Sequence, residues 1–313
     1  MARRRQVPRV VVLWVWVVWG VAACGDVSAR LDAASDSPAP SDAAQRRCDP
    51  AKPFGAGMPI TELNSPAHDD AAWLSSDERT IYFSSNRAGG AGNYDIYMAT
   101  RGSPEAQWST PALVAGVNTA GMDRHPVLSP DGLAMYAERQ TGTDYNLLVA
   151  TRASRSAPFG APLDEPTLNG TNDDDSAFVL SDRTMLFHSG RSGFSELYQA
   201  TWDGMKYTEI TMLGGIEDRT SSNGDPIMTG DKQTLYWSSD RAGGAGGFDI
   251  WVATRPAPSG RFGGATNLTG LNTANIDAPS WVSADGCVLH FTRLVSPAGA
   301  AANYELYQAV KPL

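Results

Sequence analysis

The chain of 313 residues carries a net charge of −9, with 25 Lys and Arg against 34 Asp and Glu. This acidic balance excludes the basic surface that nucleic-acid binding requires, so nucleic acid is not expected as a partner. The 31 Gly and 20 Pro favour many turns and short strands over long helices.

The N-terminus predicts a targeting segment. Arg residues crowd the first nine positions and precede an apolar run over residues 10–22. As a helix this run would be roughly 20 Å long, short of the ~30 Å hydrocarbon core, so a cleaved signal peptide over 1–23 is favoured over a membrane span. The sequence V-A-A-C that ends at Cys24 resembles the bacterial lipobox, which implies a diacylglycerol on the Cys24 thiol. The alternative is an ordinary signal peptide with an incidental cysteine.

Residues 24–53 are expected to form a flexible tether. They are rich in Ala, Ser, Asp and Pro and contain almost no large apolar residue, so they cannot bury a core. Together with the lipid on Cys24, this predicts an exported protein anchored to a membrane of the bacterial cell envelope, on its periplasmic or outer-surface face.

From Phe54 onward the chain repeats. Each unit has a short apolar stretch, a turn with an Asp, a β-rich run, and then an acidic or amide residue followed by an apolar one. The β-rich runs recur every 50 to 54 residues, ending at Phe83, Ala137, Phe187, Trp237 and Phe291. A period near 50 that is built from strands and turns predicts β-propeller blades, and five units predict five blades.

A fourth strand, running from an aromatic residue to an Asn, follows in most units, as over residues 108–118. The last unit has none, and the missing copy stands at residues 54–64 instead. The 22 residues after Phe291 and the 30 residues from Phe54 to Phe83 together fill one period. We therefore predict an all-β fold over 54–313, a five-bladed β-propeller of four-stranded antiparallel blades. Its ring is closed by the N-terminal strand, which completes the last blade and leaves no unpaired edge.

These units resemble the WD40-like repeats of TolB-type propellers. The resemblance rests on strings of the form D-G-x-x-L-Y-F and R-x-G-G-x-D-I-Y, and it covers nearly everything after residue 54. The chain departs from TolB in having five repeats instead of six blades and in lacking an N-terminal α/β domain. The resemblance therefore implies a fold more than a role.

Ring closure also predicts that two cysteines come close together. Cys48 lies just before the N-terminal strand, and Cys287 opens a strand of the blade that this strand completes. Two thiols in an oxidising compartment can pair, so a Cys48–Cys287 disulfide is predicted as possible. The alternative leaves both unpaired, with Cys287 packed as a small apolar residue.

The repeats place acidic residues before each first strand and an Arg after each second strand, which are adjacent on one propeller face. These residues define a candidate binding face: Asp70, Arg87, Asp123, Arg139, Asp175, Arg191, Asp225, Arg241, Asp277 and Arg293. The alternative is one structural staple per blade, which better explains a motif shared by all five blades.

The function predicted from these features is a non-catalytic scaffold that binds an envelope protein or a glycan. The alternative is a glycoside hydrolase of the five-bladed, arabinanase type, which would use carboxylates from different blades. Its candidates are Asp70, Asp123, Asp175 and Glu138, the last at a strand end where other repeats carry Ser or Thr. Carboxylates converging in one pocket would favour the hydrolase, and an exposed apolar patch would favour protein binding.

No residue is assigned as catalytic or metal-ligating, and no cofactor is expected. The sequence has no G-x-S-x-G elbow. The four His residues are scattered over non-equivalent repeat positions, which indicates structural or surface roles.

Overall fold

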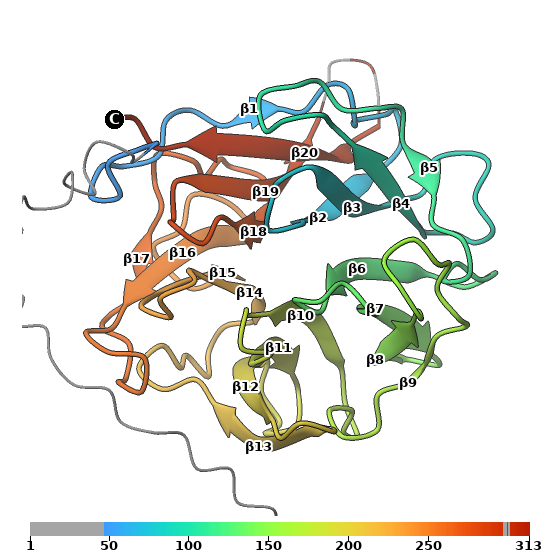
Figure 1. The fold of residues 1–313 in the computed structure, drawn as a ribbon. Helices are drawn as coiled ribbons and strands as arrows, with labels where there is room; N and C mark the ends of the chain where they lie inside the picture. The colour runs from blue at the N-terminus through green and yellow to red at the C-terminus, as the bar shows by residue number, and fades with distance from the viewer. Residues whose placement is uncertain (1–46, 297–298, 300) are drawn as a thin grey trace, which may run out of the picture. The chain divides into compact units, whose positions relative to one another are not determined.

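The computed structural model describes residues 47–296, 299 and 301–313. These residues form five four-stranded antiparallel sheets arranged around a centre, as the prediction of a five-bladed propeller requires (Figure 1). The expected signal peptide and the lipidation site Cys24 lie outside the described residues. Within the described ranges, no helix has the length and apolar character needed to cross a membrane.

Each blade runs from an inner to an outer strand. Blade 1 contains β2 (Asp69–Leu74), β3 (Thr80–Ser85), β4 (Asp95–Thr100) and β5 (Ala112–Leu113). Blade 2 contains β6 (Asp123–Leu128), β7 (Ala134–Thr141), β8 (Asp144–Thr151) and β9 (Leu163–Asp164). Blade 3 contains β10 (Asp174–Val179), β11 (Met185–Ser189), β12 (Glu196–Trp202) and β13 (Tyr207–Met212). Blade 4 contains β14 (Asn223–Met228), β15 (Thr234–Ser239), β16 (Asp249–Thr254) and β17 (Thr266–Asn267).

Blade 5 joins the two ends of the propeller. Its strands are β18 (Asp277–Val282), β19 (Val288–Val295), β20 (Asn303–Val310) and β1 (Met58–Pro59), in that order. The β1 strand pairs antiparallel with β20, and the Asn64 side chain bonds both the N–H and the C=O of Leu306. The prediction that the N-terminal strand completes the last blade is therefore confirmed.

The hydrophobic core lies between the sheets, and equivalent positions of the repeat supply its large side chains. The residues that mark the ends of the β-rich runs in blades 1, 3, 4 and 5 are fully buried: Phe83, Phe187, Trp237 and Phe291. Burying a large apolar side chain contributes about 1.5–3 kcal/mol, so these positions fix the face of each second strand that points inward.

The first two strands of a blade are joined by a turn that the repeated Asp holds. In blade 1, the Ser75 hydroxyl donates to Asp77 at 2.6 Å and accepts from the Thr80 N–H at 3.0 Å. Blades 2, 4 and 5 repeat both contacts. The residue after the turn Asp has a positive φ, which Gly132 and Gly286 adopt without strain in blades 2 and 5.

The segment before β1 is held against blade 5. Cys48 and Cys287 form a disulfide across 239 residues of sequence, and both side chains are buried. The Asp49 N–H donates to the Pro312 carbonyl, and Arg47 pairs with Asp285 at 2.8 Å. Residues 47–53, which composition assigned to the tether, thus include contacts that fix the chain at the propeller's edge.

Candidate functional site

A side-chain pair with an Arg recurs in every blade at the start of the inner strand, with Asp as the acceptor in four blades and Asn in blade 4. An Arg within the last part of the second strand or just after it reaches the first residue of the inner strand. The pairs are Asp69–Arg87, Asp123–Arg139, Asp174–Arg191 and Asp277–Arg293, with Asn223–Arg241 in blade 4. The four aspartates are at most 1% exposed, and each Arg except Arg139 also stacks over its blade's aromatic rings. These pairs are structural staples.

The register separates the acidic candidates into two groups. Asp123 and Asp277 are staples, whereas Asp70 and Asp175 lie one residue beyond the staple position of their strands. Asp225 lies two residues beyond Asn223. Asp70, Asp175 and Asp225 line the propeller's central cavity, whereas Asp123 and Asp277 belong to the staples.

A β-bulge in the inner strands turns side chains toward this cavity. The third residue has a positive φ in blades 1 to 4: Ala71 (54°), His125 (48°), Ser176 (51°) and Asp225 (49°). The pairing register shifts at the same place in each strand. Non-glycine residues at positive φ cost of order 1–3 kcal/mol and are concentrated at functional sites.

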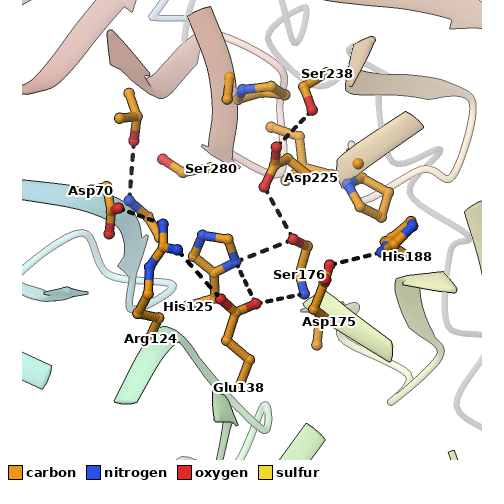
Figure 2. A pocket seen from close by; sticks show the side chains of 18 of the residues that line it. Asp70, Arg124, His125, Glu138, Asp175, Ser176, His188, Asp225, Ser238 and Ser280 are labelled. Atoms are coloured by element: carbon orange, nitrogen blue, oxygen red, sulfur yellow. Dashed lines mark hydrogen bonds and ion pairs between the residues drawn. The ribbon is translucent and has the colours of Figure 1, made fainter. Parts of the chain in front are cut away.

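The cavity has a volume of about 380 Å³ and lies on the face where the inner strands begin. Figure 2 shows side chains around it that come from all five blades: Asp70 of blade 1, Glu138 of blade 2, Asp175 of blade 3, Asp225 of blade 4 and Ser280 of blade 5. Four aromatic side chains also line it: Trp73, Tyr145, Phe248 and Tyr304. No group of three or more His, Cys, Asp or Glu residues in the described ranges is arranged to hold a metal ion.

Two ion pairs occupy the wall formed by blades 1 and 2. Arg124 binds Asp70 at 2.7 Å, and the Nδ1 of His125 lies 2.9 Å from Glu138. Burial by itself lowers the pKa of His125, but the charge and hydrogen bond of Glu138 raise it to about 9. Burial raises the pKa of Glu138, but His125 and Arg124 together lower it to about 2. Both groups are therefore charged at neutral pH.

This buried pair predicts a pH-dependent stability. The folded pKa of His125 is above its unfolded value of ~6.5, so its contribution is complete below about pH 6.5 and is lost as pH rises through about 9. The contribution of Glu138 is present above its unfolded pKa and is lost as pH falls through about 2. We expect the free energy of unfolding to fall by about 2–3 kcal/mol between pH 6.5 and 9.5.

Urea unfolding of the Glu138→Gln variant measures this contribution. The variant is expected to be less stable at pH 6.5 and to lose the alkaline decline. The Asp164→Asn variant, altered on the exposed strand β9, serves as the matched control and should keep the wild-type pH dependence. An unchanged alkaline decline in Glu138→Gln would show that the pair does not set it.

Asp225 is a carboxyl group whose pKa the cavity raises. Its two oxygens accept hydrogen bonds from Ser176 at 3.2 Å and Ser238 at 2.6 Å. Burial raises the pKa of Asp225, and the charges of Asp175 and Glu138 add to the rise, so the lowering by His125 is outweighed. The cavity thus combines carboxyl groups with opposite pKa shifts.

A second hydrogen-bonded set lies in blade 3. The Nδ1 of His188 is 3.0 Å from Asp175, and its Nε2 is 2.7 Å from the Ser195 hydroxyl. Burial lowers the pKa of His188, but the hydrogen bond and charge of Asp175 raise it above the ordinary value. His188 occupies the strand position at which Glu138 stands in blade 2, so the expectation of Ser or Thr there in all other blades is wrong for blade 3.

Sequence reasoning identified part of this site. Glu138 was singled out and lies in the cavity, as do Asp70 and Asp175. The sequence prediction did not include Arg124, His125, His188 or Ser195. Ser195 stands where the other four blades carry an aromatic residue, and His188 where three of them carry Ser or Thr. The other two histidines have different surroundings: His68 accepts the Tyr304 N–H, and His290 is buried with its pKa lowered to about 3 by burial and Arg101.

Comparison with known proteins identifies the fold. TolB from Acinetobacter baumannii superimposes with a TM-score of 0.53 at 14% identity, over 80% of this chain and 55% of that chain. The Bacteroides ovatus xyloglucan PUL GH43B gives 0.51 at 13% identity, over 80% of this chain and 53% of that one. An endo-arabinase from Bacteroides thetaiotaomicron gives 0.50 at 14% identity, over 83% and 97%.

The chain therefore spans little more than half of the TolB and GH43B chains. At these identities the similarity establishes the TolB-like propeller fold. No protein-family model matches the sequence, and no curated protein matches it.

Proposed function

We propose that the protein binds a carbohydrate in its central cavity, at the cell envelope to which the signal sequence and Cys24 direct it. The observation that carries this proposal is the asymmetry of the cavity. The staples repeat in all blades, but Arg124, His125 and Glu138 stand at positions where every other blade carries a different residue. Departures from a repeat that converge in one place require an explanation other than architecture.

The chemistry of the cavity suits a polyhydroxylated ligand. Asp70 Oδ1, Arg124 Nε and Ser280 Oγ are buried and lack a hydrogen-bond partner among the described residues. They comprise an acceptor, a donor and a hydroxyl that serves as both, which matches the hydroxyl groups of a sugar. Leaving such groups unpaired costs about 1–3 kcal/mol each, so a ligand that pairs them is favoured.

The size and aromatic lining support the same ligand class. A volume of about 380 Å³ suits one or two sugar rings and lies within the range of about 300–1,000 Å³ typical of small-molecule sites. Tyr145, Phe248 and Tyr304 offer flat apolar surfaces, onto which the C–H face of a sugar ring packs.

The exposed apolar side chains do not favour a protein-docking face. The large ones among the described residues are distributed over the outer strands and loops of several blades: Met58, Leu113, Leu163, Phe194, Met205, Val310 and Leu313. A docking surface would gather such residues in one contiguous patch.

Calorimetric titration of the full-length protein with a panel of envelope and plant-type oligosaccharides tests the proposal. We expect one or more sugars to bind, and the Asp70→Asn variant to bind about 10- to 100-fold more weakly, because hydrogen bonds to a charged group contribute about 1.5–3 kcal/mol. Asp164→Asn makes the same chemical change far from the cavity and should bind as the wild type does. Absence of binding across the panel, or equal binding by Asp70→Asn, would contradict the proposal.

Glycosidase activity is the second candidate, favoured by the opposite pKa shifts of Asp225 and Glu138. Glycoside hydrolysis uses one carboxyl group as an acid, which a raised pKa favours, and one as an ionised carboxylate, which a lowered pKa favours. The same titration mixtures, examined by mass spectrometry, report cleavage. Products that disappear in the Asp225→Asn variant would support the glycosidase, whereas intact sugars would support binding alone.

A further inference from the structure

We propose that Ser195, His188 and Asp175 form a Ser–His–Asp catalytic triad that hydrolyses an ester, with an O-acylated sugar as the substrate class. The sugar part of this assignment rests on the proposed function, but the triad itself does not. The Ser195 Oγ lies 2.7 Å from His188 Nε2, and His188 Nδ1 lies 3.0 Å from an Asp175 oxygen. Nucleophile, base and orienting carboxylate thus stand in hydrogen-bonded series.

Blade 3 departs from the repeat at the positions of both Ser195 and His188. The residue just before the acidic or amide residue of the third strand is aromatic in the other blades, where it is Tyr94, Tyr145, Phe248 or Tyr304. Blade 3 has Ser195 there. The strand position of His188 carries Ser84, Glu138, Ser238 or Thr292 elsewhere. A structural role common to the blades does not account for two coordinated exceptions in one blade.

The three side chains of the triad are accessible from the central cavity. All three side chains line the central cavity, and the small Ser195 replaces a bulky aromatic ring at the cavity wall. His188 is 9% exposed and the Asp175 side chain 18%, so the pair is shielded but in contact with the cavity. A ligand held by Asp70 and Ser280 therefore shares its enclosure with the Ser195 hydroxyl.

The reaction follows from these positions. Ser195 Oγ attacks the ester carbonyl while His188 Nε2 takes the hydroxyl proton, and His188 returns that proton to the departing alcohol as the C–O bond breaks. Water then attacks the acyl-Ser195 in the same way, which releases the carboxylic acid and restores the serine. Asp175 orients the imidazole and stabilises its charged form.

The hydroxyl of Ser195 has a second acceptor within reach, the Asn223 carbonyl at 3.2 Å. Its single proton serves one acceptor at a time, and only the bond to His188 activates the oxygen. Esters are the appropriate substrate class because an alcohol departs from the tetrahedral intermediate more readily than an amine does.

A fluorophosphonate probe tests the nucleophile directly. The full-length protein is treated with the probe, and the adduct is located by peptide mass spectrometry. We expect one adduct on Ser195, no adduct in Ser195→Ala, and labelling at least about 100-fold slower in His188→Gln. The Ser222→Ala variant, which changes another cavity-lining serine, should label like the wild type. Circular dichroism checks that each variant folds.

Ester hydrolysis provides the second readout, with p-nitrophenyl acetate and a peracetylated monosaccharide as substrates. We expect kcat/KM to fall at least about a thousandfold in Ser195→Ala. In the wild type it should rise with pH as His188 loses its proton, with a midpoint above about 6.5 because Asp175, Asp225 and Asp173 face this imidazole. A purely structural Ser195 would produce no such profile.

An unlabelled Ser195, or labelling that is unaffected in His188→Gln, would overturn the triad. Sugar binding without labelling would overturn the triad and leave the proposed function standing. Labelling and ester hydrolysis without sugar binding would support the triad and contradict the carbohydrate assignment.

Discussion

Replacing Asp277 with Ala is expected to lower the free energy of unfolding by about 3–5 kcal/mol, because it leaves a largely buried charge without its partner. Asp277 is fully buried and accepts hydrogen bonds from Arg293 at 2.6 Å and from both the N–H and the hydroxyl of Thr273. The guanidinium of Arg293 packs over the rings of Phe291 and Tyr307, so it stays at this position when Asp277 is replaced.

Blade 4 supplies a natural comparison for this experiment. There the amide oxygen of Asn223 accepts from Arg241 at 2.7 Å, so an uncharged acceptor maintains the staple. Asp277→Asn should therefore cost clearly less than Asp277→Ala in urea unfolding. Asp164→Ala, on the exposed strand β9, should stay within about 0.5 kcal/mol of the wild type. Equal stability of Asp277→Ala and the wild type would mean that the repeated pairs are not staples.

Removing the Cys48–Cys287 disulfide is expected to destabilise the propeller by about 3–5 kcal/mol, since it closes a very long loop in the unfolded chain. The bond joins residues 239 apart and ties the segment before β1 to the start of β19. The β1 strand contributes only two residues to blade 5, so the covalent link carries much of the ring closure.

Thermal unfolding with and without dithiothreitol separates this effect from the loss of buried sulfur. The reductant should lower the melting temperature of the wild type but leave the Cys48→Ala/Cys287→Ala double variant unchanged. Matching melting temperatures for the wild type in both conditions would indicate that the bond adds no stability.

The fold could be predicted because the same sequence pattern occurs in every blade. A turn Asp, a buried strand end and a period of 50 to 54 residues occur five times, so chance variation in one blade is corrected by the others. Ring closure followed from the position of the missing strand. The same repetition also brought Cys48 and Cys287 to one blade, where the structure joins them.

The site was only partly predictable because the pairing register of the strands decides which side chains face the cavity. Asp69 and Asp70 are neighbours in sequence, yet one forms a staple and the other lines the cavity, and only strand pairing tells them apart. The bulge that turns His125 and Asp225 inward leaves no simple pattern in the sequence. Ser195 and His188 could have been found by aligning the repeats and asking which positions depart from their equivalents.

A crystal structure of the full-length protein with the tightest-binding sugar tests most directly whether the central cavity is the functional site. The account predicts density for the sugar in this cavity, in contact with Asp70 and Ser280 and beside the rings of Tyr145 or Tyr304. Density confined to another surface, such as the hollow around Leu128 and Val282 at the turns between first and second strands, would contradict it.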